Sequence, residues 1–583
     1  MNRQIPRPEH PRPAFMRDSW LNLNGEWEFF NDLSASGVDR RLYEADRFDG
    51  KITVPFCPES KLSGVGFTDF MPSVWYARNI DVDEKALKGR VLLHFGACDY
   101  ITTVYVNGVA AGSHTGGYTS FVFDITDRLK AGSNRLVVHA SDELRSSRQP
   151  CGKQSRLYYS HNCDYTRTTG IWQTVWLEFV SANYIEKVRI NANDTAGKVR
   201  VEAYLNAYLK DAVLRAEVTY RGAKAFEGEF PVQGVRNDIC FAVSPVMLWN
   251  VGEPNLYDVK FTLLVKGAPV DSVNSYFGIR RIDIDGKKVR INGKSVFQRL
   301  VLDQGFYPDG IYTAPDDAAL KRDIELSMAL GFNGARLHQK VFEERYLYHA
   351  DKLGYIVWGE FASWGIDIFD PYTLHTMLPQ WLESMDRDYN RPCIIGWCPH
   401  NETWDCAGKQ QLDTNISLLY QATKAADPTR PVIDTSGNYH TADTDIYDVH
   451  DYVQEPDEFR KRYLGEEKFE KWPTRQHYDG KSPFFMSEYG GIKWQESASV
   501  ESKTQSWGYG NTPKSRDEYC SRFCGLAEAL LDSETVMGLC YTQLTDVEQE
   551  QNGLYFYDRS PKFTDSEYAR LRASLTKKAA IED

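Results

Sequence analysis

Polar residues follow several apolar stretches in the second half of the chain, at the places where buried strands would end. They are Asp303 and Gln304, Arg336 and His338, Glu360, Asn401 and Glu402, Asp434, His450 and Asp451, Glu488, and Asp546. In a barrel of parallel strands, side chains at the carboxyl ends face the substrate, whereas mid-strand side chains fill the core. A purely structural barrel has no reason to collect such residues, so the pattern predicts an active site.

Two of these residues, Glu402 and Glu488, are of the type that glycoside hydrolysis needs. That reaction uses one carboxylic acid to protonate the leaving oxygen and a second carboxylate on the other side of the anomeric carbon. They end the stretches IIGWCPHNE and FFMSEYG, the fourth and seventh expected strands, and could face each other across the barrel mouth. Strand-end glutamates in structural ion pairs would give the same pattern, so the neighbouring residues must distinguish a catalytic role from a structural one.

The neighbours of both glutamates suit a sugar site. Asn401 can hydrogen-bond a sugar hydroxyl, and we expect Tyr489 to contact Glu488 and hold it ionised. Sugar rings stack on aromatic faces, which Trp397, Trp404 and Trp494 could offer.

Motifs of other enzyme classes are missing. The sequence has no GxSxG nucleophile elbow, no HExxH zinc motif and no GxxxxGK[ST] phosphate loop. His338 and His450 have no diagnostic metal-ligand spacing, so we expect hydrogen-bonding roles for them. We expect that no cofactor is required, although a divalent cation near Glu360 stays open.

The elements that position these residues are those of a barrel. After Phe277, helical periods alternate with apolar strands, which is typical of βα units around a parallel sheet. The eight strand candidates are VFQRLVLD, GARLHQK, YIVWGEF, IIGWCPHNE, PVIDTS, IYDVHDY, FFMSEYG and VMGLCYTQL. Eight is the number of strands in a (β/α)8 TIM barrel. Thr313 stands before Pro315, Asp316 and a helical pattern, and is therefore predicted to cap that helix.

The first part of the chain predicts two β-sandwich domains. Short alternating runs separated by turn residues are typical of antiparallel sandwiches. In ITTVYVNGVAAGSH, Asn107 and Gly108 supply the residues of a tight hairpin turn. We assign residues 1–180 to the first sandwich, 181–276 to a smaller immunoglobulin-like sandwich, and 277–583 to the barrel.

Composition excludes some partners. Acidic residues (81) outnumber basic ones (68), for a net charge of −13, whereas nucleic acid binding needs a concentrated cationic face. No apolar run reaches the roughly 20 residues that cross a bilayer, so we expect no membrane association. The first residues lack a signal peptide's apolar core, and the eleven cysteines are scattered as expected for free thiols. We therefore expect a cytoplasmic protein, unless a signal peptide has been removed before residue 1.

Five stretches carry a resemblance to a known family: LNLNGEWEF, VWYARNI, GIWQTVW, GFNGARLHQKVFEERYLYHADKLGYIVWGE, and GWCPHNE together with MSEYG. Over its whole length the chain resembles glycoside hydrolase family 2, the family of β-galactosidases, β-glucuronidases and β-mannosidases. The resemblance implies a jelly-roll sugar-binding domain, an immunoglobulin-like domain and a catalytic TIM barrel, in that order.

The resemblance also implies roles for single residues. Glu402 corresponds to the family's acid/base and Glu488 to its nucleophile, in a reaction that retains anomeric configuration through a covalent glycosyl-enzyme, with carboxyl groups about 5 to 5.5 Å apart. Asp164 falls where family members extend a loop that grips sugar hydroxyls, and Arg336 matches the arginine that orients the nucleophile. We expect further substrate contacts from Asp303, His338, Glu360, Trp404 and His450.

Departures from the family bear on the sugar. Glucuronidases of the family carry an Asn-x-Lys that reads the sugar carboxylate, whereas the corresponding region here, QNGLYFYDRSPK, lacks that lysine, which disfavours a glucuronide. Where the large galactosidases have Trp on the eighth strand this chain has Tyr541, and Gly490-Gly491 replaces a His after the nucleophile motif.

The function expected from the sequence is that of an exo-acting, retaining, β-galactosidase-like glycoside hydrolase whose partner is a glycoside. An α-L-arabinofuranosidase or β-galactofuranosidase of the same family is the alternative, because the altered pocket could suit a five-membered ring. A non-catalytic carbohydrate-binding protein on the same barrel is the alternative from another class. The sequence leaves open whether the chains form a homo-oligomer.

Overall fold

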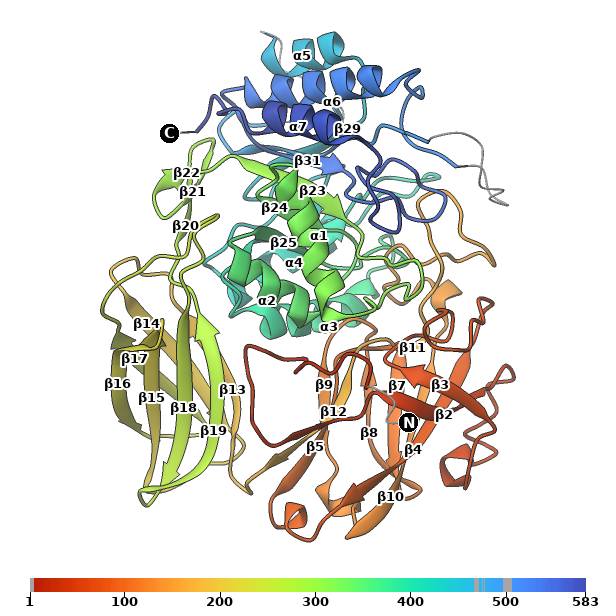
Figure 1. Ribbon diagram of the computed structural model, residues 1–583, viewed down its shortest axis with the longest axis vertical. Helices are drawn as coiled ribbons and strands as arrows, with labels where there is room; N and C mark the ends of the chain where they lie inside the picture. Colours follow the sequence, from red (N-terminus) through yellow and green to blue (C-terminus); the bar gives the residue numbers. More distant parts are fainter. Residues whose placement is uncertain (1–4, 466–470, 474, 476–477, 496–505, 583) are drawn as a thin grey trace.

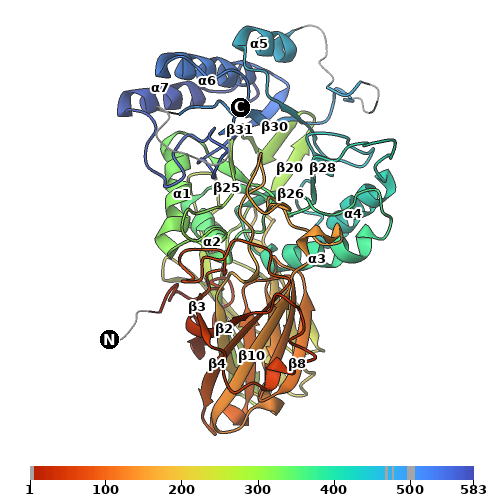
Figure 2. The ribbon, with the colours of Figure 1, turned by 90° about the vertical axis from the view of Figure 1, so that its right-hand side faces the viewer.

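The computed structural model describes residues 5–465, 471–473, 475, 478–495 and 506–582. Two β-sandwich domains lie side by side, and a barrel of parallel strands lies above both of them in Figure 1. Figure 2, turned by 90°, shows α6 (Arg516–Leu531) and α7 (Asp565–Leu575) at the end of the barrel farthest from the sandwiches. The expected multidomain fold, two sandwiches followed by a barrel, is confirmed.

The first domain packs a four-stranded sheet, β1-β12-β5-β9, against a six-stranded sheet, β3-β2-β4-β10-β7-β8, around one core. Its strands are β1 (Trp20–Asn22), β2 (Gly25–Asn31), β3 (Gly50–Val54), β4 (Ser73–Val82), β5 (Arg90–Phe95), β6 (Cys98–Asp99), β7 (Ile101–Val106), β8 (Val109–Thr115), β9 (Phe121–Asp124), β10 (Gly132–Ser141), β11 (Gly170–Ile171) and β12 (Val175–Val180). Short 3-10 helices lie at Leu42–Glu44, Ala86–Lys88, Thr126–Arg128 and Leu144–Ser146. Asn107 and Gly108, with φ of 52° and 79°, form the predicted hairpin turn between β7 and β8.

The second domain is a smaller sandwich of a three-stranded sheet, β13-β14-β17, and a four-stranded sheet, β16-β15-β18-β19. Its strands are β13 (Ile185–Asn191), β14 (Lys198–Leu205), β15 (Ala212–Tyr220), β16 (Ala223–Pro231), β17 (Arg236–Ala242), β18 (Tyr257–Val265) and β19 (Ala268–Phe277). Every second residue of β14 and β15 is buried, because alternate side chains of a strand point to the same face. These apolar residues form a core separate from that of the first domain.

A small sheet of β20 (Ile282–Asp285), β21 (Lys288–Ile291) and β22 (Lys294–Ser295) leads into the barrel, whose parallel strands run in the order β26-β25-β24-β23-β31-β30-β29. They are β23 (Gln298–Asp303), β24 (Gly334–Leu337), β25 (Ile356–Glu360), β26 (Ile394–Cys398), β29 (Tyr447–Asp451), β30 (Phe484–Gly490) and β31 (Val536–Thr542). The remaining strand candidate, residues 431–436, contributes only β28 (Thr435–Ser436), which pairs with β27 (His400–Asn401). The shortest strand pairing of the barrel, β27 with β28, therefore lies directly beside Glu402.

The described helices cover the outside of the barrel. They are α1 (Asp317–Ala329), α2 (Glu344–Leu353), α3 (Thr373–Asp388), α4 (Asp413–Ala426) and α5 (Pro456–Leu464), besides α6 and α7. The predicted cap of α1 is wrong by three residues, since the Asp316 side chain accepts the hydrogen bond from the Ala319 amide (2.8 Å). Thr313 instead donates to the Trp172 carbonyl (2.5 Å) and so joins the first domain to the barrel.

Buried polar contacts fix the domains to one another. Arg17 donates to Glu178 of the first domain (2.7 Å) and to Asp271 of the second (3.0 Å). The hydroxyl of Tyr276, on the last strand of the second domain, donates to Asp351 of α2 (2.7 Å). Because these groups are buried, separating the domains would leave them without partners.

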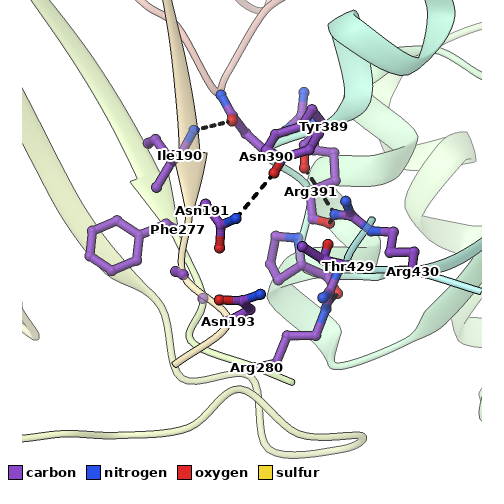
Figure 3. A pocket seen from close by; sticks show the side chains of 13 residues that line it. Ile190, Asn191, Asn193, Phe277, Arg280, Tyr389, Asn390, Arg391, Thr429 and Arg430 are labelled. Atoms are coloured by element: carbon purple, nitrogen blue, oxygen red, sulfur yellow. Dashed lines mark hydrogen bonds between the residues drawn. The ribbon is translucent and has the colours of Figure 1, made fainter. Parts of the chain in front are cut away.

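A small pocket lies between the second domain and the barrel (Figure 3). The Ile190 amide donates to the Asn390 side chain (2.7 Å), and Arg280 donates to the carbonyls of Pro392 (2.7 Å) and Ile394 (2.6 Å). Its volume of about 30 Å³ is about that of one water molecule, and no carboxylate lines it. It belongs to the domain interface and offers no room for a sugar.

Two general features complete the description. None of the described helices is both long and apolar enough to cross a bilayer. All eleven cysteines carry free thiols.

Candidate active site

The two glutamates singled out by the sequence lie together at the carboxyl end of the barrel. Glu402 follows β27 and Glu488 lies in the last part of β30. A carboxylate oxygen of each, together with a ring nitrogen of His450 from β29, fall within 4.8 Å of one another. Residues more than eighty positions apart thus form one compact group.

The Glu488 carboxylate is held by two donors. Arg336 Nη1 donates to Oε1 (2.8 Å), and the Tyr452 hydroxyl donates to Oε2 (2.5 Å). Burial alone would raise the pKa of Glu488, but the positive charges of His450 and Arg336 outweigh burial and hold that pKa below its ordinary value. Glu488 is therefore an ionised carboxylate with a fixed orientation, as a nucleophile needs to be.

Arg336 lies beneath the site and is almost fully buried. Its Nε donates to Glu360 Oε2 (2.6 Å), and its Nη2 donates to Asn401 Oδ1 (2.5 Å). Glu360 also accepts from the Gln339 amide (2.9 Å). The guanidinium thus connects strands β24, β25, β27 and β30 by directed bonds to their side chains.

Glu402 has a different environment from Glu488. Its side chain is about a quarter exposed, and its backbone is in the left-handed region (φ 47°), held by the bond from its amide to the Ser436 carbonyl (2.8 Å). His450 Nδ1 lies 2.8 Å from its carboxylate. Burial disfavours charge on Glu402, but this hydrogen bond and the charge of His450 lower its pKa to about 2 in the free protein. An acid/base role for Glu402 therefore requires that a bound substrate weaken this contact and raise the pKa of Glu402.

A loop of the first domain closes one side of the site; it is the orange trace that climbs onto the barrel in Figure 1. Asp164 lines the same pocket as Asn401 and Glu402. The next residue, Tyr165, donates its hydroxyl to the buried Glu550 carboxylate (2.6 Å). The loop is therefore fixed to the barrel at the position where Asp164 enters the pocket.

Three family models match successive parts of the chain. They are "Glycosyl hydrolases family 2, sugar binding domain" over residues 21–180, "Glycosyl hydrolases family 2" over residues 183–280, and "Glycosyl hydrolases family 2, TIM barrel domain" over residues 282–575. The chain belongs to glycosyl hydrolase family 2.

Curated relatives of the chain include proteins named beta-glucuronidase and proteins named beta-galactosidase. The chain is 26% identical to a putative beta-glucuronidase of Formosa agariphila, over 72% of this chain and 50% of the relative. It is also 26% identical to a beta-galactosidase of Thermoanaerobacter pseudethanolicus, over 55% of this chain and 44% of the relative. The chain spans about half the length of these curated relatives.

Solved structures give the same architecture. The chain is similar to a Bifidobacterium dentium beta-glucuronidase complexed with coumarin-3-O-glucuronide, with a TM-score of 0.79 and 20% identity, over 97% of this chain and 99% of that one. At this identity the likeness shows the shared fold and leaves the sugar open.

Most of the predicted site residues of this family 2 chain gather at the site. His338 Nδ1 lies 3.0 Å from Glu360 and 4.0 Å from Glu488. The Asn401 Nδ2 group is buried, and the described residues give it no hydrogen-bond partner, so it is available to a sugar hydroxyl. Trp404 is 41% exposed and lines the pocket beside Glu402.

Two predicted contacts are not found, for one shared reason. Tyr489 does not contact Glu488; its buried ring packs against Phe459 and Tyr541, on the outer side of the strand. Asp303 also faces outward and accepts from the Tyr346 hydroxyl (3.2 Å) beneath the helices. Neighbouring residues of a strand point to opposite faces, so a residue next to an inward one is directed away from the site.

Two of the expected stacking faces are also absent. Trp397 is fully buried, with its indole N–H donating to Asp427 (2.9 Å). Trp494 packs edge-on against Tyr519 of α6.

Sequence reasoning missed three residues of the site: Tyr452, which bonds Glu488, and Trp364 and Lys153. The Lys153 side chain comes from the first domain, is buried, and places its ammonium 4.0 Å from the centre of the Trp364 ring. The described residues give its Nζ no hydrogen-bond or ion-pair partner. Burial alone would lower the pKa of Lys153, but nearby acidic groups, Cys163 and Glu550 first, raise it above its ordinary value. No strand-end pattern marks such a residue, because it reaches the site from another domain.

Metal binding at Glu360, which the sequence left open, would compete with existing bonds, because Arg336 and the Gln339 amide occupy its two oxygens. Within the described ranges, the group whose geometry could hold a metal ion is Glu402, His450 and Glu488. Two of them, Glu402 and Glu488, are the residues to which the family resemblance gives the chemistry, and Arg336 already pairs with Glu488.

The first prediction concerns His450. In His450→Gln the charge that lowers the pKa of Glu402 is absent, so this pKa rises and the protonated acid persists to higher pH. The fall of kcat/KM with rising pH reports the acid of the free protein, so it should begin at higher pH in the variant. With an aryl glycoside, we expect the ratio of kcat/KM at pH 6 to that at pH 4 to be larger in His450→Gln than in the wild type. His139→Gln, in the first domain, serves as the control. A His450→Gln profile that overlays the wild-type profile, or moves to lower pH, contradicts the assignment.

Proposed function

We propose that this protein is an exo-acting glycoside hydrolase that retains anomeric configuration. The observation that carries the proposal is the spacing of Glu402 and Glu488, whose carboxylate oxygens fall within 4.8 Å of one another together with His450. Retaining enzymes hold their two carboxyl groups about 5 to 5.5 Å apart, whereas inverting enzymes leave about 6.5 to 9.5 Å for a water molecule. The shorter spacing favours direct attack on the sugar by one carboxylate.

The two glutamates have distinct roles in this reaction. Glu488, ionised and oriented by Arg336 and Tyr452, attacks the anomeric carbon while Glu402 donates its proton to the leaving oxygen. Glu402, now ionised, then takes a proton from a water molecule as the water oxygen attacks the same carbon and displaces Glu488. Both steps balance with the two glutamates and one water molecule, so this mechanism uses no cofactor.

Exo action follows from the enclosure of the site. Glu488, Asn401 and His338 are nearly fully buried, and the Asp164 loop and Lys153 of the first domain close one side. Such a site admits the end of a chain but leaves no path for a polymer to pass through. We assign hydroxyl binding on the terminal sugar to Asn401, His450 and Asp164.

A neutral sugar of the β-galactoside type suits the charges of this site best. The negative charges of Glu402, Glu488 and Glu550 all raise the pKa of Lys153. Arg336 already forms ion pairs with two carboxylates, Glu360 and Glu488. A uronic acid would add another buried carboxylate to a group that already has an excess of them, at a large cost in desolvation. The region that lacks the expected lysine has no spare cation either, because Lys562 is paired with Asp546 (2.5 Å).

A β-glucuronide is the second candidate, and one observation favours it. The buried ammonium of Lys153 is close enough to Glu402 and Glu488 for their charges to raise its pKa, and the described residues give it no ion-pair partner. It could therefore bind a sugar carboxylate. The furanosides named from the sequence, an α-L-arabinofuranoside or a β-galactofuranoside, share the geometry and are separated from a galactoside only by assay. A carbohydrate-binding protein without activity has no need for an ionised, oriented Glu488 beside a second carboxylate.

The second prediction tests the roles of the glutamates. Glu488→Gln keeps the shape of the side chain and removes the nucleophile, so kcat on a 4-nitrophenyl glycoside should fall at least about 1,000-fold with the unfolding temperature little changed. Glu402→Gln is the matched variant: 4-nitrophenol leaves without a proton, so this variant should still release a burst of about one equivalent. A Glu488→Gln protein that keeps a tenth of the wild-type rate refutes the assignment.

The third prediction concerns the sugar. We expect the 4-nitrophenyl β-galactopyranoside to be hydrolysed in preference to the β-glucuronide, the α-L-arabinofuranoside and the β-galactofuranoside. Lys153→Met removes a charged hydrogen-bond donor and should lower kcat/KM for the galactoside about 10-fold, whereas the exposed-site control Lys88→Met should leave it unchanged. A wild-type preference for the β-glucuronide that disappears in Lys153→Met would establish the second candidate instead.

A further inference from the structure

A pocket of about 260 Å³ lies beside Glu402, and the sugar site accounts for only part of its lining. One wall comes from the first domain, including Cys151 and Asp164. The other walls come from the loop after β25, residues 363–369, and from residues 400–404 after β26. Glu402 is among the lining residues, whereas Glu488 is not.

The lining contains both charged and apolar side chains. Glu402, Asp164 and Arg156 supply charge, while a group of larger side chains gives apolar surface. These are Trp364, Ile366, Ile368, Phe369 and Trp404. Two polar residues among them are already engaged, since Asp367 accepts from the Phe369 amide (2.9 Å) and Thr403 bonds the Thr435 hydroxyl (2.9 Å). An occupant beyond Glu402 would therefore meet mainly apolar surface.

Two tryptophans contribute to this wall, and Lys153 lies over one face of the Trp364 ring. Trp364 is oriented by its indole N–H, which donates to the Asn401 carbonyl (3.1 Å). Trp404, two residues after Glu402, is 41% exposed. An exposed tryptophan beside a reacting group is a ready surface for a flat ring, because aromatic faces gain from stacking.

The position of Glu402 decides which part of the substrate occupies the pocket. The acid protonates the leaving oxygen, so the leaving group lies on the acid's side of the cleaved bond. The sugar, in contrast, lies against the nucleophile Glu488. Asn401 and Asp164, which we assign to the sugar, also line this pocket, so the sugar reaches into it. The remaining lining, from residues 363–369 and 403–404, accompanies Glu402 without Glu488 and is therefore on the leaving-group side.

We propose that this pocket binds the aglycone and that it selects a flat, apolar ring system of one or two fused rings. The inference rests on the proposed function. An apolar cavity of about 150 Å³ holds one benzene ring. The sugar occupies part of the 260 Å³ pocket, and the remaining space beside Glu402 suits a small ring system. The natural substrate is accordingly a glycoside of an aromatic alcohol, with its oxygen at Glu402 and its ring on Trp404 and Trp364.

The test compares leaving groups within each variant, so that their intrinsic reactivities cancel. Wild type and Trp404→Ala are assayed on the 4-methylumbelliferyl glycoside and the methyl glycoside of the same sugar. The ratio of the two kcat/KM values should fall about 3- to 10-fold in Trp404→Ala, the loss expected for one aromatic contact. Tyr208→Ala removes an exposed aromatic side chain (57%) from the second domain and should leave the ratio unchanged.

The variant also separates the two steps of the reaction. The aglycone has left before deglycosylation, so kcat on the umbelliferyl substrate should change much less than kcat/KM when that step limits turnover. Phe369→Ala provides a second variant if Trp404→Ala fails to fold. An unchanged ratio, or a loss seen only with a disaccharide substrate, overturns the proposal.

Failure of the proposed function would look different. A wild-type protein that hydrolyses no glycoside refutes the function but leaves the pocket testable by titration with 4-methylumbelliferone, followed by tryptophan fluorescence. Saturable quenching that is weakened in Trp404→Ala supports the apolar site, and absence of saturable quenching in wild type overturns it.

Discussion

The site depends on one buried cation. Arg336 lies nearly without solvent contact and directs its three nitrogens at Glu360, Glu488 and Asn401. A buried guanidinium is stable only when such partners satisfy it, and removing one partner leaves the remaining charges uncompensated. The strands that carry the four residues are therefore constrained to one register. Arg336 therefore both orients the nucleophile and, with His450, keeps it ionised, and the same guanidinium joins the strands at the barrel's carboxyl end.

The acid/base is positioned in the opposite way. Glu402 occupies a left-handed backbone conformation directly after β27, which pairs with β28 over only two residues. Such a conformation costs on the order of 1 to 3 kcal/mol and persists only where surrounding bonds enforce it. Its environment is set by groups from other elements: His450 on one side, and the Asp164 loop and Lys153 of the first domain on the other. The sandwich domain thus contributes to the chemistry of the barrel and is more than a support.

The sequence predicted the architecture and both glutamates, because strand and helix periods differ and because the strand ends collect polar residues. The prediction of side-chain direction failed where a shift of one residue decides which face of a strand a side chain occupies. Tyr489 and Asp303 each adjoin an inward-facing position, and a shift of one residue directs a side chain to the opposite face of the strand. It also missed Tyr452, Trp364 and Lys153, which reach the site from loops or from another domain. Local patterns carry no information about such contacts; only the packing of the domains brings these residues together.

The central claim, that Glu488 becomes covalently bound to the sugar, has a direct measurement. A 2-deoxy-2-fluoro glycoside with a good leaving group slows the second step more than the first, so the glycosyl-enzyme accumulates. Mass spectrometry of the digested protein should then find one fluoroglycosyl group on the peptide containing residues 484–490, attached at Glu488. A label on any other residue, or release of the product with inverted anomeric configuration and no labelled peptide, would contradict the account.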